Sequence, residues 1–303
     1  MVSALLVRAS ESERLERLAT RNRLAQLVAG RFVAGKTLEE GIVAARELAE
    51  LGRTVSLDLV GEHVTTAAES DQAADSYLET IEAMATAHLR SGVSVKPSQL
   101  GTGLDLDDAR NRLTKIAEAA GSAGLHVTLD MEDASTTEPT ITLVEALHAE
   151  GHHHVGCAVQ SYLHRTEEDV ERLNELGASV RLCKGAYAES DRIAYHDRDR
   201  IDESFRRCTT SLLEHGTYPR IATHDHRLIG FTRREARRLG RGPDDYEFQM
   251  LYGVRTDVQE RLIGIGENLC VYLPFGEAWY AYFMRRLAER PANLVFFARM
   301  LTG

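Results

Sequence analysis

Short apolar segments recur along this chain of 303 residues, and most are separated from the next by a charged stretch long enough to hold a helix. Alternation of this kind predicts parallel strands joined by crossover helices. Eight such units in a chain of this length favour the α/β class and a (β/α)₈, TIM-type barrel. The expected strands span residues 55–60, 92–95, 126–129, 155–159, 180–183, 219–222, 246–251 and 269–273.

A doubly wound open sheet is the competing architecture, but no glycine-rich dinucleotide fingerprint follows the first expected strand. Residues 10–50 show a helical pattern, with Leu15, Leu18, Leu24 and Leu27 at near-helical spacing. No linker rich in proline, glycine or serine divides the chain. We therefore expect an N-terminal helical extension over residues 1–50 and a single barrel over residues 51–303.

The composition excludes several classes of function. A net charge of -10 argues against nucleic-acid binding, which requires a basic surface. It also disfavours adhesion to an anionic membrane. One arginine-rich segment, which we interpret as an exposed helix face, contains Arg233, Arg234, Arg237, Arg238 and Arg241.

The sequence also indicates a compartment. The N-terminal apolar run is too short for a signal peptide, and no later apolar segment is long enough to span a membrane. The four cysteines, Cys157, Cys183, Cys208 and Cys270, are scattered, and three lie in apolar runs. Reduced core thiols are therefore expected rather than disulfides or a zinc site. Together these features predict a cytoplasmic protein.

Polar and ionisable residues gather where the expected strands end. In a (β/α)₈ barrel these C-terminal ends form the active-site face. Buried polar groups are unfavourable there unless they are paired or used. The mixture of cations, carboxylates and tyrosines suits a zwitterionic or anionic substrate and a phosphate-bearing cofactor. The group comprises Asp58, Gly61, Glu62, His63, Lys96, Asp130, Met131, Glu132, Asp133, Gln160, Tyr162, Arg181, Lys184, Gly185, Tyr187, Thr223, His224, Asp225, His226, Tyr252, Arg255, Tyr272 and Glu277.

The segment that follows the last expected strand carries a second signal. A turn marked by Pro274 and Gly276 leads into a helix that begins near Trp279. Helical spacing places Arg285 and Arg286 on the same side as Tyr282. Two adjacent guanidiniums beside a tyrosine suit a small carboxylate, which arginine can bind in a bidentate manner.

Two other chemistries are considered at the strand ends. Asp130, Glu132, Asp133, His224 and His226 do not have a recognised metal-ligand spacing and lie among arginines, so no metal is expected. The run at residues 152–154 is three histidines, but it precedes a strand and is expected to be a solvated loop on the opposite face.

A Schiff-base lyase of the aldolase type remains an alternative. A desolvated lysine among cations can be nucleophilic at neutral pH, and the candidates are Lys96 and Lys184.

Six motifs, matching in order from about Leu57 to Ala292, resemble the FAD-dependent proline dehydrogenases, and the length is typical of the monofunctional bacterial enzymes. The motifs are Ser94-Val-Lys-Pro-Ser-Gln-Leu-Gly101, Leu129-Asp-Met-Glu-Asp133, Arg181-Leu-Cys-Lys-Gly-Ala-Tyr187, Ala222-Thr-His-Asp225, Phe248-Gln-Met-Leu-Tyr-Gly253 and the segment from Tyr272 to Arg286.

The resemblance implies a distorted (β/α)₈ barrel with FAD at its C-terminal mouth and the last helix folded over the site. It implies that the proline carboxylate is bound by Lys96, Arg285 and Arg286, and that the ring packs against Tyr272, Tyr282 and Tyr187. Asp130 would order the substrate side, and Arg181 would stabilise negative charge on the reduced flavin. The other positions implied to contact the flavin, or to lie close to it, are Met131, Gln160, Cys183, Lys184, Gly185, Ala186, Thr223 and His224.

The implied activity is oxidation of L-proline to Δ1-pyrroline-5-carboxylate, the first step of proline catabolism to glutamate, by hydride transfer to flavin N5. Electrons would pass to a quinone through transient, peripheral contact with the inner face of the membrane. Glu62 would be a gate that pairs with Arg285 when the site is empty. A non-catalytic flavin or proline sensor is the alternative from a different class.

Two local features bear on this interpretation. Arg181 and Lys184 are three residues apart, so a regular strand would place them on opposite faces. Both can reach one cofactor only if the strand ends or bulges between them. Pro97 should end its strand directly after Lys96.

Overall fold

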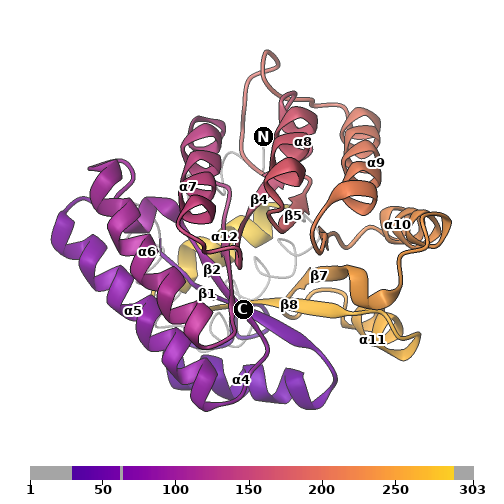
Figure 1. Ribbon diagram of the computed structural model, residues 1–303. Helices are drawn as coiled ribbons and strands as arrows, with labels where there is room; N and C mark the ends of the chain where they lie inside the picture. Colours follow the sequence, from indigo (N-terminus) through magenta and orange to yellow (C-terminus); the bar gives the residue numbers. More distant parts are fainter. Residues whose placement is uncertain (1–28, 62–63, 290–303) are drawn as a thin grey trace, which may run out of the picture.

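The computed structural model describes residues 29–61 and 64–289, with the side chains of residues 285–289 outside that description. Within these residues, eight parallel strands close into a barrel in sequence order (Figure 1). The predicted (β/α)₈ barrel is confirmed. The strands are β1 (Thr54–Leu59), β2 (Ser91–Val95), β3 (His126–Leu129), β4 (Val155–Gln160), β5 (Val180–Cys183), β6 (Arg220–Ala222), β7 (Glu247–Leu251) and β8 (Leu269–Phe275).

Helices join consecutive strands and form an outer ring. Thr37 and Thr66 begin α4 and α5 with reciprocal capping bonds to Glu40 and Glu69, and these bonds satisfy backbone donors of the first turns. The α-helices are α4 (Leu38–Glu50), α5 (Ala67–Thr86), α6 (Leu106–Ser122), α7 (Thr137–Ala149), α8 (Thr166–Leu176), α9 (Arg198–His215), α10 (His226–Arg238), α11 (Thr256–Gly264) and α12 (Trp279–Glu289). Short 3₁₀ turns are η1 (Pro97–Leu100), η2 (Ala134–Thr136) and η3 (Pro243–Asp245).

The first and last described helices have unusual positions. Helix α4 precedes β1 and packs against both β1 and β8, so it closes the outer ring where a helix following β8 would otherwise lie. Helix α12 is therefore free to lie elsewhere, and Figure 1 shows it across the middle of the barrel. Phe283 of α12 is fully buried in a separate apolar cluster with Phe32 and Val33. The boundary that we predict at residue 50 stays a prediction.

Strand β8 is longer than expected. The sequence suggested a turn at Pro274, but the strand continues to Phe275, with Pro274 in register with Asp58 of β1. Proline lacks an N–H donor, yet its carbonyl oxygen accepts a hydrogen bond from the N–H of Ala34 at 2.8 Å. The segment before α4 thus supports the strand beyond the predicted end. The turn begins at Gly276, whose φ of 128° lies in the left-handed region.

The interior of the barrel is polar, which the sequence analysis did not anticipate. In β1, Val55 and Leu57 face the helices and belong to the main apolar core, whereas Ser56 and Asp58 alternate with them and point inward. The same alternation occurs in β2, β3 and β7. Parallel strands covered by helices are usually apolar on both faces. Here the apolar core lies between strands and helices, and polar contacts fill the barrel.

The opposite, N-terminal mouth of the barrel contains a separate cavity of about 500 Å³, whose lining includes His126, His154, Arg220 and Glu247. We predicted that the histidines at residues 152–154 lie in a solvated loop on this face. The prediction is only partly correct, because His154 is half-buried and its Nε2 lies 2.8 Å from the Ala117 carbonyl oxygen. The ring nitrogen Nε2 of His126 is buried without a hydrogen-bond partner among the described residues. Burial, reinforced by Arg220 and Arg181, holds the pKa of His126 well below 6.5.

In the part of the chain that the structure describes, no helix combines the length and apolar character needed to cross a membrane.

His126 should make the fold sensitive to acid. Its pKa is lowered in the folded state, so below about pH 6.5 the unfolded chain binds a proton that the folded chain does not. Stability should therefore fall on acidification by up to about 1.4 kcal/mol per pH unit from this group. We expect His126→Asn to reduce the slope of unfolding free energy against pH, measured by urea denaturation between pH 5 and 7. The exposed His88, replaced by Asn, is the control; equal slopes in both variants would contradict the assignment.

Candidate active site

A cavity of about 890 Å³ opens at the C-terminal ends of the strands. Helix α12 borders it through Tyr282, which agrees with the expectation that the last helix covers the site. The predicted site residues that line it are Lys96, Asp130, Met131, Gln160, Arg181, Cys183, Lys184, Gly185, Ala186, Tyr187, Thr223, His224, Tyr272 and Tyr282. Three predicted residues cannot be compared: Glu62 lies outside the described residues, as do the side chains of Arg285 and Arg286.

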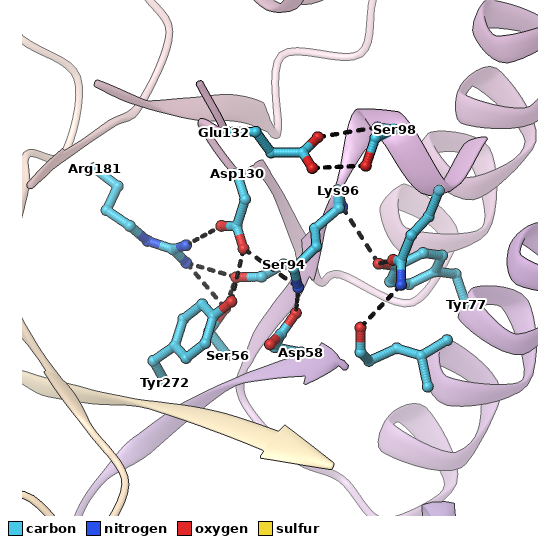
Figure 2. Close-up of polar contacts among 12 residues, drawn as sticks. Ser56, Asp58, Tyr77, Ser94, Lys96, Ser98, Asp130, Glu132, Arg181 and Tyr272 are labelled. Carbon is cyan, nitrogen blue, oxygen red and sulfur yellow. Dashed lines mark hydrogen bonds and ion pairs between the residues drawn. The ribbon is translucent and has the colours of Figure 1, made fainter. Parts of the chain in front are cut away.

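Lys96 lies in a buried acidic setting (Figure 2). Its Nζ pairs with the fully buried carboxylate of Asp58 and lies 4.0 Å from Asp130 Oδ2. Strand β2 ends at Val95 and η1 begins at Pro97, as predicted, which places Lys96 at the mouth. Burial raises the pKa of Asp58, and the Lys96 ammonium opposes that shift.

Arg181 is the centre of the polar interior, with only 3% of its surface exposed. Its Nη1 donates to Asp130 Oδ1 at 2.5 Å, and its Nε donates to Gln249 Oε1 at 2.6 Å. Its Nη2 donates to Ser94 Oγ at 2.8 Å and to Ser56 Oγ at 3.1 Å. Burial alone would lower the pKa of Arg181, but Asp130 together with Cys183 and Tyr272 outweighs it and the pKa is raised. The guanidinium is therefore a fixed, buried cation.

Asp130 connects this cation to the aromatic wall. While Oδ1 accepts from Arg181, Oδ2 accepts from the Tyr272 hydroxyl at 2.7 Å. Burial, with Asp130 and Asp58 nearby, raises the pKa of Tyr272 well above 10. Tyr272 therefore remains a neutral donor, and its ring lies 5.2 Å from the Arg181 guanidinium carbon. The side chain of Asp130 thus orders both the cation and the tyrosine.

The ends of β3 and β4 are joined to η1. Glu132 accepts from the Ser98 hydroxyl at 2.6 Å and from the Ser98 N–H at 3.1 Å (Figure 2). The Gln160 amide nitrogen donates to the Glu132 carbonyl oxygen at 2.8 Å. These contacts fix the rim on the side of Lys96.

The end of β5 resolves the spacing of Arg181 and Lys184. The strand ends at Cys183, so Lys184 lies in the following loop and both cations line one cavity. Lys184 Nζ lies 2.5 Å from Asp202 Oδ1 and 3.4 Å from Asp225 Oδ2. Gly185 has a φ of 106°, and an added Cβ would lie 2.2 Å from the Tyr162 ring, so this position requires glycine.

The N-termini of α9 and α10 extend the cavity away from Lys96. Asp225 caps α10 by accepting from the N–H of Arg227, and Asp197 caps α9. His224 Nε2 accepts from the N–H of Leu251 at 3.0 Å, so this nitrogen is unprotonated. Helix N-termini attract anions, and the cavity is lined here by Arg198, Asp199, His226 and Arg227. Arg198 and Arg227 were not predicted, because they lie in the first turns of helices rather than at the ends of strands.

Several contacting residues were also absent from the predicted set or had no assigned role. Ser56, Ser94 and Gln249 lie inside their strands. Ser56 and Ser94 come two residues before Asp58 and Lys96, and Gln249 comes two residues before the end of β7. Alternation of polar and apolar residues within each strand was the signal that could have identified them. Asp58 was noted as a strand-end residue, but its pairing with Lys96 depends on the barrel register.

The described residues contain no group of three or more histidines, cysteines or acidic residues that could hold a metal ion. The cysteines are free thiols, three buried and Cys183 half-buried.

Comparison with known proteins agrees with the fold and the motifs. The proline dehydrogenase family model matches residues 42–299. The chain belongs to the proline dehydrogenase family. It is 38% identical over 293 residues to proline dehydrogenase 2 of Bacillus subtilis, covering 97% of this chain and 96% of that protein. It is 39% identical over 303 residues to the proline dehydrogenase of Deinococcus radiodurans, with the same coverage.

The fold also matches that of larger proteins. A crystal structure of proline utilization A (PutA) from Bdellovibrio bacteriovorus, inactivated by N-propargylglycine, aligns with a TM-score of 0.82 and 24% identity. The alignment covers 87% of this chain and 32% of that chain, so the proline dehydrogenase chain spans about a third of that PutA.

The buried pair of Asp58 and Lys96 should be important for stability. Asp58→Asn removes the charge that faces Lys96 and leaves a buried ammonium less compensated, so we expect a loss of about 3 kcal/mol in unfolding free energy. The matched control is Asp71→Asn, because Asp71 pairs with Arg112 through a side chain that is 65% exposed, and exposed pairs contribute little. Urea denaturation measures both. Equal losses in the two variants would contradict the role of the buried pair.

Proposed function

We propose that this member of the proline dehydrogenase family oxidises L-proline to Δ1-pyrroline-5-carboxylate and uses FAD as the hydride acceptor. One observation carries the proposal. Every described residue that the family resemblance implicates in substrate or cofactor binding lines a single cavity at the C-terminal mouth. The family match over residues 42–299 supports the same substrate.

The substrate side is the part of the cavity around Lys96. Its buried ammonium binds the proline carboxylate together with Arg285 and Arg286, whose positions lie on α12 after Tyr282. The rings of Tyr272 and Tyr282 pack against the pyrrolidine ring. Tyr187 completes this wall from a more exposed position, at 39% exposure. Holding the substrate in one orientation is the main contribution of these groups to the rate.

The cofactor side fits FAD in the chemistry of its lining. Met131, Cys183 and Leu251 offer a partly apolar surface for a flat ring system. Lys184, Arg198 and Arg227 offer cations near two helix N-termini, where a diphosphate would be favoured. FAD, when bound, would take the hydride that leaves the ring carbon next to the proline nitrogen.

Arg181 supplies the electrostatic part of catalysis. Its buried guanidinium is held by Asp130, so its charge does not need to reorganise when negative charge accumulates nearby. Asp130 also fixes the Tyr272 hydroxyl by accepting its hydrogen bond. We retain Glu62 as a gate that pairs with Arg285 in the empty site; both lie outside the described side chains.

We also propose a quinone as the electron acceptor, reached by a cytoplasmic protein through transient membrane contact. The arginine-rich segment on α10 and just after it does not favour that contact, because several of its side chains have partners within the protein. Arg233 pairs with Glu267 at 2.6 Å, Arg238 pairs with Glu235 at 2.7 Å, and Arg241 donates to the Leu213 carbonyl oxygen. These contacts support the interpretation of α10 as an ordinary exposed helix.

The Schiff-base alternative is disfavoured by the lysine environments. Lys96 faces Asp58, and Lys184 faces Asp202 and Asp225. A Schiff-base lysine must lose its proton before it attacks a carbonyl, and carboxylate neighbours favour the charged form.

The visible spectrum of the purified protein, recorded without oxygen before and after addition of L-proline, tests the proposal. We expect a yellow protein whose flavin absorbance is bleached by proline. A yellow protein that proline leaves oxidised would favour a sensor. A colourless protein that takes up no added FAD, or borohydride trapping of a substrate on Lys96 or Lys184, would overturn the proposal.

The carboxylate clamp makes a separate prediction. Arg286→Lys should raise the apparent KM for proline by about tenfold, the equivalent of one charge-assisted hydrogen bond, because an ammonium cannot replace a bidentate guanidinium. Steady-state kinetics with an artificial acceptor measure this effect. Arg234→Lys on the exposed face of α10 is the control. An unchanged KM in the Arg286 variant would remove this residue from the clamp.

A further inference from the structure

A line of buried polar groups continues from Arg181 toward the opposite mouth of the barrel. Gln249 and Glu247 are successive inward-facing residues of β7, exposed by only 2% and 4%. Gln249 Nε2 donates to Glu247 Oε1 at 2.6 Å. Glu247 Oε1 also lies 3.6 Å from Arg220 Nε. Glu247 lines the N-terminal cavity, not the substrate cavity, so it is two hydrogen bonds from Arg181 and contacts no proposed ligand.

The direction of these hydrogen bonds follows from the two groups at either end, the Glu247 carboxylate and the Arg181 guanidinium. An ionised carboxylate only accepts hydrogen bonds, and a guanidinium only donates them. An amide between them must give its NH₂ group to Glu247 and its oxygen to Arg181. The amide in the opposite orientation would place two acceptors against each other at Glu247 and two donors against each other at Arg181. Glu247 therefore selects the orientation of Gln249 that can bind Arg181.

We propose that Glu247 is a positioning residue that acts through Gln249 to hold Arg181 in place at the cofactor side of the cavity. The proposal rests on the proposed function, in which Arg181 stabilises the reduced flavin. Neither the family motifs nor the cavity lining assigns a role to Glu247.

The neighbours of Glu247 hold its carboxylate in one position. Arg220 donates from Nη1 to Thr128 Oγ1 at 3.1 Å and compensates the buried carboxylate. The Tyr218 hydroxyl donates to Glu247 Oε2 at 3.4 Å. Strand β6 and the segment before it therefore hold Glu247, with Arg220 facing the oxygen that Gln249 also contacts and Tyr218 bound to the other oxygen.

Three variants test this arrangement through the flavin midpoint potential. Gln249→Met removes the acceptor for Arg181 and keeps an unbranched side chain of similar length. Glu247→Leu combined with Arg220→Met removes the selecting carboxylate while keeping buried charge balanced. We expect both to weaken the preference for reduced flavin about tenfold, which lowers the potential by about 30 mV for a two-electron couple. The third variant combines Gln249→Met with Glu247→Leu and Arg220→Met. Its potential should not fall further, because all these changes act through the contact between Gln249 and Arg181.

Two conservative variants are the controls. Glu247→Gln keeps an oxygen facing Gln249 and Arg220, and Tyr218→Phe removes only the contact to the other oxygen of Glu247. Both should keep the potential of the unaltered protein. A fall in Glu247→Gln as large as in Gln249→Met would mean that the charge of Glu247, rather than the hydrogen-bond direction, sets the potential, and it would overturn the proposal.

A measurement without flavin separates this inference from the proposed function. The Nε–H proton of Arg181, assigned by ¹⁵N NMR with an Arg181→Met protein, should be protected from water exchange by its bond to Gln249. Protection should be lost in Gln249→Met and in the Glu247→Leu/Arg220→Met protein, and kept in Glu247→Gln. Protection in all variants would overturn the proposal even if proline bleaches the flavin. Failure of proline to bleach the flavin, with these NMR results intact, would overturn only the proposed function.

Discussion

The hydrogen-bonded burial of the Arg181 guanidinium is the interaction on which the rest of the barrel interior depends. A buried cation is strongly unfavourable unless partners surround it. Here Asp130, Gln249, Ser56 and Ser94 supply them from β1, β2, β7 and the end of β3. Because these partners come from four separate segments, the closed barrel is required to assemble them. The polar interior and the barrel closure therefore stabilise each other.

The placement of the helices determines how the site is covered. Helix α4 packs against β8 and β1, so the outer ring is complete without a helix after β8. The last helix is then available to lie over the mouth, where Tyr282 reaches the cavity and Phe283 is anchored in a separate apolar cluster. Tyr282 belongs to the same apolar cluster, so this packing attaches α12, and with it the proposed carboxylate clamp, to the barrel.

Much of this arrangement could be predicted because the controlling signals are local. Pro97 ends β2 by restricting its neighbour, so Lys96 lies at the mouth as expected. From the spacing of Arg181 and Lys184 we predicted that the strand ends or bulges between them, and β5 does end at Cys183. Pro274 misled the prediction because its effect was judged without the pairing that β1 and Ala34 provide. Glu62, Arg285 and Arg286 stay predictions.

The sequence by itself determined the eight-unit barrel, its family and many of the residues that line the cavity at the C-terminal mouth. Periodicity and strand-end position are properties of neighbouring residues, and they can be recognised in the sequence without knowledge of the fold. Only the tertiary structure decided which buried groups meet: Asp58 with Lys96, Tyr272 with Asp130, and Glu247 with Arg181 through Gln249. These partners are separated by up to 142 residues in the chain. Their contacts depend on barrel register and closure, which no local pattern encodes.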